Sequence, residues 1–167
     1  IYQQARGIAD DEVHPERARQ SISKETTFGE DVTDPRVLRE TLRWAAQEVG
    51  FLARHGGYQG RLVTLKIRLH PFETHTRSRT LPVRTASHSE LFRTAWSLFE
   101  AEPWAGKPVR LVGVGLSGWA EEGGVQTDLF GSEAPDPHPR DERLDETLDA
   151  IRRKFGKGYL QRGLSRR

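Results

Sequence analysis

Residues 61–81 read RLVTLKIRLHPFETHTRSRTL. Its first half alternates apolar and polar side chains with a period of two, which is typical of a half-buried β-strand. The apolar positions are Val63, Leu65, Ile67 and Leu69. After Pro71 and Phe72, a second extended run interleaves threonine and serine with arginine. The stretch therefore predicts a β-hairpin with one face toward a core and the other basic and rich in hydroxyl groups.

The polar side chains of this hairpin are of the kinds that bind phosphate. Ammonium, guanidinium and hydroxyl groups placed side by side suit phosphate oxygens. We expect them to cluster on the open face, and the candidates on the hairpin are Lys66, Arg68, Thr76, Arg77, Ser78, Arg79 and Thr80. Ser21, Ser23 and Lys24, in an earlier extended segment, would add donors. The alternative is that these side chains are solvated and bind nothing.

The composition limits the class of protein. The 167 residues suit one domain with tails, and 26 basic residues against 24 acidic ones leave a net charge of only +2. Any affinity for nucleic acid must therefore come from local clustering of charge. The absence of cysteine excludes disulfides and cysteine nucleophiles, and no apolar run is long enough for a membrane span, so we expect a cytoplasmic protein without a membrane partner. Because the chain starts at Ile1 and contains no methionine, we expect a piece of a longer protein.

The order of elements predicts an α+β fold. A strand over residues 21–28 precedes a helix that starts at Asp34 and Pro35 and ends at Gly56. The hairpin is followed by a second helix, with a capping box of Ser87 and Glu90, and by a strand over residues 109–116. The expected buried stripe of the first helix is Leu38, Leu42, Ala45, Val49 and Leu52. This βαββαβ order predicts a four-stranded antiparallel sheet with both helices on one face.

The C-terminal part has a different character. Residues 120–140 contain few apolar anchors and end in APDPHPR, which predicts a flexible linker. Residues 141–155 carry apolar side chains at helical spacing and predict a third helix, followed by a basic tail to residue 167. The pattern leaves open whether this helix packs on the sheet.

The residue patterns do not indicate catalysis. The six histidines form no pair at ligand spacing on a helix, and the glycine-rich pieces lack a phosphate-loop signature. We therefore expect no metal site and no catalytic residue. Trp44 and Trp96 fall on the helices and are expected in or beside the core. Apart from Phe28 and Phe72, the predicted strands offer no aromatic side chain to stack on bases, so binding would be indifferent to sequence.

Four segments, taken in order, resemble the little finger domain of Y-family DNA polymerases, in particular the bacterial DNA polymerase IV (DinB) group. They are residues 21–28 (SISKETTF), 65–68 (LKIR), 76–81 (TRSRTL) and 109–114 (VRLVGV). The resemblance implies that Arg77, Ser78, Arg79 and Thr80 lie on a phosphate-contacting strand, and it implies first-strand contacts by Ser21, Ser23 and Lys24. The assignment of Lys66 and Arg68 comes from strand parity instead.

The resemblance also implies a role for the parent protein. It would be an error-prone translesion DNA polymerase whose palm domain uses Mg²⁺. We expect this chain to lack the palm, to hold no cofactor and to be inactive alone. The implied domains are the end of a thumb and a linker (1–20), the little finger (21–119), a linker (120–140) and a C-terminal helix with a basic tail (141–167).

A short cluster in the linker resembles the peptide with which polymerases bind the sliding clamp. Residues 126–130 read QTDLF, where the motif has glutamine first and leucine and phenylalanine last. The resemblance implies that Leu129 and Phe130 fill an apolar pocket of the clamp and that the Gln126 amide bonds at its rim. Thr127 stands where the motif usually has leucine. The alternative is that Leu129 and Phe130 pack on the third helix.

The function expected from these observations is sequence-independent binding of primer-template DNA, with the sliding clamp as a second partner. Two other functions suit a sheet of this topology. An RNA-binding module would need aromatic side chains on its central strands. A small-molecule regulatory domain would need an apolar open face and a defined pocket.

Overall fold

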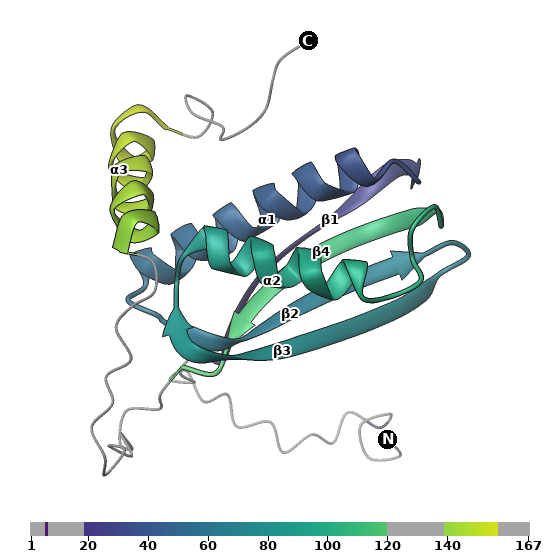
Figure 1. Cartoon of the computed structure of the whole chain (residues 1–167), viewed down its shortest axis with the longest axis horizontal. Coiled ribbons are helices and arrows are strands. Elements are labelled where there is room, and N and C mark those ends of the chain that lie inside the picture. The colour runs from purple at the N-terminus through teal and green to yellow at the C-terminus, as the bar shows by residue number, and fades with distance from the viewer. Residues whose placement is uncertain (1–5, 7–18, 120–138, 157–167) are drawn as a thin grey trace.

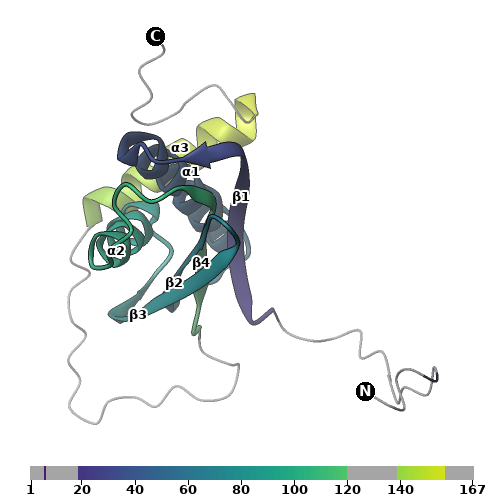
Figure 2. The ribbon, with the colours of Figure 1, turned by 90° about the vertical axis from the view of Figure 1, so that its right-hand side faces the viewer.

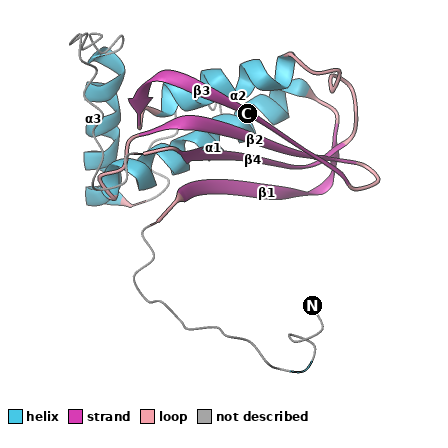
Figure 3. Cartoon of the chain, turned by 90° about the horizontal axis from the view of Figure 1, so that it is seen from below, coloured by secondary structure: helices cyan, strands magenta, loops and turns pink. Residues whose placement is uncertain are grey.

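The computed structural model of the chain describes residues 6, 19–119 and 139–156. The elements are β1 (Ser21–Val32), α1 (Pro35–His55), β2 (Gly60–Leu69), β3 (Glu73–Thr85), α2 (His88–Glu100), β4 (Val109–Ser117) and α3 (Pro139–Phe155). The strands form one antiparallel sheet in the order β1-β4-β2-β3, and α1 and α2 cover one of its faces (Figures 1 and 2). The α+β arrangement predicted from the sequence is confirmed. Seen from below, the four strands lie side by side, with β1 and β3 at the two edges (Figure 3).

The start of α1 follows its sequence signals closely. Asp34 is the N-cap and its carboxylate accepts a hydrogen bond of 2.8 Å from the Arg36 backbone N–H, while Pro35 occupies the first helical position. Leu38, Leu42, Ala45 and Val49 are buried as predicted. Leu52 was expected on the same stripe but is 38% exposed, and Ala53 is buried instead. A helix of 3.6 residues per turn drifts away from a strict seven-residue repeat, so by the last turn the buried stripe has moved by one position.

The core lies between the sheet and these two helices. From β2 it takes Val63, Leu65, Ile67 and Leu69, which are at most 3% exposed. From β4 it takes Val112, Val114 and Leu116, and from α2 it takes Leu91, Ala95 and Phe99. Trp44 and Trp96 are partly buried against this core, as expected. Since alternate residues of a strand point to opposite faces, the Thr64, Lys66 and Arg68 side chains lie on the face that α1 and α2 leave open.

The start of α2 differs from the sequence prediction. Ser87 is the N-cap, but its side chain makes no capping hydrogen bond, so the predicted capping box with Glu90 is wrong. Among the residues that the structure describes, none bonds to the buried Ser87 hydroxyl, and the Ser87 backbone N–H donates to Thr85 Oγ1 at 3.0 Å. A carboxylate from a distant element takes over the role of the cap: the His88 backbone N–H donates to Asp145 Oδ2 of α3 at 3.1 Å. A negative charge there suits the positive end of the helix dipole.

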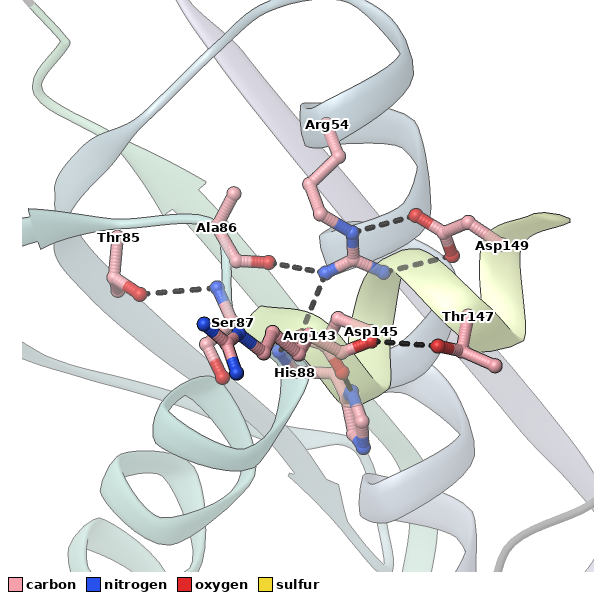
Figure 4. A network of polar contacts seen from close by, with 9 residues as sticks. All are labelled: Arg54, Thr85, Ala86, Ser87, His88, Arg143, Asp145, Thr147 and Asp149. Carbon is pink, nitrogen blue, oxygen red and sulfur yellow. Dashed lines mark hydrogen bonds and ion pairs between the residues drawn. The ribbon is translucent and has the colours of Figure 1, made fainter. Parts of the chain in front are cut away.

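The third helix packs against α1 and the start of α2, which answers the question the sequence left open. Arg54 of α1 donates from Nε and Nη2 to the two Asp149 oxygens at 2.6 and 2.9 Å, and from Nη1 to Asp145 Oδ2 at 3.0 Å (Figure 4). Its Nη1 also donates to the Ala86 carbonyl at 2.6 Å. Asp145, fully buried, pairs in addition with Nδ1 of His88.

No helix among the described residues is long and apolar enough to span a membrane.

Candidate nucleic-acid interface

The strand register arranges the open face into four rows that run across the sheet. From β1 to β3 they are Ser21–Ser117–Leu62–Thr80, Ser23–Gly115–Thr64–Ser78, Glu25–Gly113–Lys66–Thr76 and Thr27–Leu111–Arg68–Thr74. We call these the open-face rows. Nine of their sixteen residues carry hydroxyl groups and two are cationic, so most of the surface consists of donors that suit phosphate oxygens.

The middle of the open-face rows is a trough, because β4 contributes two glycines there. A Cβ atom at Gly115 would come no nearer than 3.6 Å to a neighbour, and its contacts would be Ser23 and Thr64 on either side. A shallow depression of about 280 Å³ follows this line, walled by residues of β1, β2 and β3. The backbone of β4 therefore forms the floor of the trough and can be approached closely by a ligand.

The side chains of the rows are already linked to one another. Thr64 and Ser78 share a hydrogen bond of 2.9 Å between their hydroxyl oxygens, and Arg68 Nε donates to Thr74 Oγ1 at 3.0 Å. Lys66 Nζ lies 2.8 Å from Glu25 Oε2 across Gly113. These pairs are exposed, so solvent or a ligand can replace them at small cost in free energy.

Arg77 and Arg79 do not lie with Lys66 and Arg68, and the prediction of one shared cluster is wrong. The register pairs Arg77 with Leu65 and Arg79 with Val63, which places both arginines on the face that α2 covers. The cause is the hairpin turn: it brings even-numbered residues of β2 opposite even-numbered residues of β3. Ser78, Thr76 and Thr80 are thus on the open face, and the arginines between them are not.

Both arginines contact the helix layer instead. Arg77 donates from Nε and Nη2 to the two Glu102 oxygens at 2.5 and 3.1 Å, and its guanidinium carbon lies 5.6 Å from the centre of the Trp104 ring. These hydrogen bonds lower the pKa of Glu102 and raise that of Arg77. Arg79 Nη1 donates to Ser97 Oγ at 3.2 Å and stays exposed at the sheet edge. Their contact with DNA stays a prediction.

Lys24 has a similar position at the opposite edge. Along β1 the residues on the helix side include Ile22, which is buried, and Lys24, whose Nζ lies 5.4 Å from the centre of the Trp44 ring. Ser21 and Ser23 alternate with these two and are exposed on the open face. Of the predicted site, seven residues share the open face, namely Ser21, Ser23, Lys66, Arg68, Thr76, Ser78 and Thr80.

Several residues of the open face were missed in the sequence. Glu25, Thr64 and the two glycines of β4 face the same trough as Ser23 and Lys66. The period of two in β1 could have placed Glu25 with Ser23, but its position opposite Lys66 requires the register of three strands. Gln126, Leu129 and Phe130 lie outside the described residues.

Other kinds of site are less well supported. Among the described residues, no group of three or more histidine, aspartate or glutamate side chains could hold a metal ion. A second cavity, of about 430 Å³, lies beside α3 and is lined by the Arg54 and Asp145 network and by His55 and Tyr58. Its charged groups are largely paired with each other, so its walls serve the docking of α3.

Comparisons with known proteins place the chain in a family. Residues 19–129 match the model of the impB/mucB/samB family C-terminal domain. DNA polymerase IV of Caulobacter vibrioides is 37% identical over 151 residues, which are 90% of this chain and 36% of that protein. DNA polymerase IV of Methanoculleus marisnigri is 46% identical over 117 residues, 70% of this chain and 32% of that protein. The chain thus spans about a third of the length of these curated relatives.

A solved structure agrees in fold. It is described as a complex of the β-clamp processivity factor and the little finger domain of PolIV, and it matches with a TM-score of 0.52 at 19% identity. The match covers 66% of this chain and 99% of the solved chain. At this identity the likeness concerns the fold alone, which is the sheet with two helices described above. The match over residues 19–129 shows that the chain belongs to the impB/mucB/samB family of C-terminal domains, which has relatives named DNA polymerase IV, and its fold is that of the solved little finger domain.

Proposed function

We propose that the open-face rows bind the sugar-phosphate backbone of primer-template DNA without reading its sequence. The parent protein would be an error-prone translesion DNA polymerase that acts in DNA repair and damage tolerance, and this domain would hold the duplex beside the active site. The observation that carries the proposal is the trough itself. Hydroxyl groups and Lys66 line a glycine floor on the sheet face that α1 and α2 leave uncovered, and Arg68 lies in the next row beside Leu111.

The chemistry of the rows favours a ligand made of phosphates over one made of bases. Phosphate contacts fix the position of a protein on DNA but carry no sequence information. The sixteen residues of the open-face rows include no aromatic side chain, whereas single-stranded RNA and DNA are usually held by stacking of bases on aromatic rings. The rows also lack the apolar surface that a small-molecule regulatory domain would need.

The experiment measures binding of a primer-template duplex by fluorescence anisotropy over a series of salt concentrations. Replacement of Lys66 and Arg68 by alanine should weaken binding to unrelated sequences alike. It should also reduce the magnitude of the salt slope by about 0.9 for each lost phosphate contact. A matched control removes two positive charges from the helix layer, Arg39 and Arg43, which contact the rings of Phe92 and Trp96 on the far side from the trough.

Two results would contradict the proposal. One is an unchanged salt slope in the Lys66 and Arg68 variant together with a reduced slope in the control. The other is tighter binding of single-stranded RNA than of the duplex. Paired replacement of Arg77 and Arg79 by alanine tests the β3 edge separately, and a reduced slope there would extend the interface beyond the open face.

A sliding clamp is the second partner that we propose. The solved little finger domain is described as part of a complex with the β-clamp processivity factor, and residues 126–130 of this chain resemble a clamp-binding peptide. The apolar pair Leu129 and Phe130 would supply most of the binding free energy by filling a pocket. Replacement of Phe130 by alanine should abolish co-elution of the chain with a bacterial β-clamp and leave duplex binding unchanged. Undiminished co-elution would contradict this assignment.

A further inference from the structure

One acidic residue lies in the centre of the proposed DNA-binding face. Among the sixteen residues of the open-face rows, Glu25 is the sole carboxylate. It occupies the third row, where the other charged residue is Lys66. A negative charge at this place repels phosphates, so its presence on a surface that binds DNA has to be explained.

The backbone is arranged so that Glu25 can reach Lys66. The two residues stand on β1 and β2 with β4 between them, and Gly113 of β4 separates them in the register. A Cβ atom at Gly113 would lie 2.7 Å from the Glu25 Cβ and 3.3 Å from its Cα, which leaves no room for a side chain. The absence of that side chain lets the Glu25 carboxylate and the Lys66 ammonium meet at 2.8 Å.

The pair is exposed, so its role in stability is small. The Lys66 and Glu25 side chains are 37% and 47% exposed, and an ion pair of this kind in solvent contributes little to folding. Its effect on a phosphate ligand is larger, because a phosphate must either displace the carboxylate from Lys66 or remain near it. Bound to Glu25, Lys66 adds almost no net positive charge to the trough.

We propose that Glu25 attenuates DNA binding by holding the Lys66 ammonium in a neutral pair. This inference rests on the proposed function of the open face and adds a residue that sets its affinity. The third open-face row, which contains Glu25 and Lys66, then binds phosphate weakly. Moderate affinity suits a domain that has to release the duplex as the polymerase advances.

The test compares the chain with its Glu25→Gln variant in duplex binding over a salt series. The amide keeps the shape of the side chain but frees Lys66 to neutralise a phosphate. Affinity should rise by on the order of fivefold at low salt, the effect of one charge pair in a solvated setting, and the salt slope should steepen by about 0.9. In a Lys66→Gln background the same change should raise affinity by less than about twofold, because the freed ammonium is absent.

The matched control is Glu40→Gln, which removes an exposed carboxylate from α1 in the layer on the other side of the sheet. It should alter affinity by less than about twofold, since distant charges are screened by salt. Equal effects of Glu25→Gln and Glu40→Gln, or an unchanged affinity in Glu25→Gln, would overturn the role of Glu25. The proposed function would still stand in that case, provided that the parent chain binds the duplex. Absence of duplex binding by the parent chain even at low salt would overturn both. An equal gain in the Lys66→Gln background would show direct repulsion and contradict the pairing with Lys66.

Discussion

At the scale of single residues, Gly115 provides a test of the trough that does not depend on charge. A methyl group at this position would lie at ordinary contact distance, 3.6 Å, from Ser23 and Thr64. Gly115→Ala should therefore fold normally and gain roughly 0.5 to 1 kcal/mol in stability, because glycine weakens the interior of a strand. The added methyl group stands on the floor of the trough, so affinity for the duplex should fall.

Thermal unfolding and anisotropy titration of Gly115→Ala, side by side, check this prediction. Gly113→Ala is the contrasting variant, because its Cβ would collide with Glu25, and it should lose stability. Duplex affinity that is unaffected by Gly115→Ala, in a variant shown to be folded, would mean that no ligand approaches the β4 backbone.

The same scale shows how far residues could be assigned from the sequence. Lys66 and Arg68 were placed correctly, because the apolar partners in β2 fix which face is open. Arg77 and Arg79 were placed on the wrong face. In β3 both the odd-numbered and the even-numbered residues from 74 to 80 are polar, so the sequence does not show which set faces the helices, and the hairpin turn decides it. An edge strand tolerates this pattern because its helix-side residues reach past α2 to solvent. Arg77, for example, is 42% exposed while it pairs with Glu102.

At the scale of elements, α3 is held by polar groups and should therefore respond to a single isosteric change. Asp145 is fully buried between Arg54 and His88. In Asp145→Asn the Arg54 guanidinium loses one of its two carboxylate partners, and the negative charge at the start of α2 is lost. Removal of one partner from a buried pair costs on the order of 3 kcal/mol, so α3 should detach while the sheet stays folded.

The docking of α3 should also depend on pH, and the sign follows from the pKa of Asp145. Burial acts to raise this pKa, but the hydrogen bonds and charges of His88 and Arg54 outweigh it, so the pKa lies below its ordinary value of 3.8. A lowered pKa in the folded state means that the stabilisation is complete above the ordinary value and is lost as the pH falls through the folded value.

Amide hydrogen exchange measures this docking directly. In the parent chain, protection of α3 should persist from neutral pH down to about 4 and fall below that. Asp145→Asn should lower protection of α3 at neutral pH and leave β2 and β4 protected. Glu146→Gln, a neighbouring change at an exposed position, serves as control. Equal protection of α3 in Asp145→Asn and the parent chain would contradict the claim that the polar contacts of Asp145 hold α3 in place.

The existence of α3 was predictable from its spacing of apolar residues, but its partner was not. The contacts of Asp145 and Asp149 are with residues more than fifty positions away in the chain. These contacts are made by polar side chains, and the spacing of hydrophobic residues carries no information about them. The capping box failed for the same reason: Ser87 and Glu90 have the right spacing, but the carboxylate of Asp145 occupies the helix start.

At the scale of the whole molecule, the architecture separates a stabilising face from a binding face. Both helices pack on one side of the sheet and leave the other side to the open-face rows (Figures 1 and 3). The order of elements was enough to predict this, because a βαββαβ chain with short connections has few ways to cover its apolar face. What the sequence could not supply was the register, and the register decides which cations and hydroxyl groups share a surface.

Backbone amide chemical shifts, measured by nuclear magnetic resonance, would locate bound DNA on the surface of the domain. The chain would be titrated with two primer-template duplexes of unrelated sequence. The proposal predicts that both duplexes shift the same amides, with the largest changes along the trough at Ser23, Thr64, Lys66, Gly113 and Gly115, and small changes on the outer surface of α1. Shifts confined to the helix layer, or different residues for the two sequences, would contradict binding of the DNA backbone by the open face.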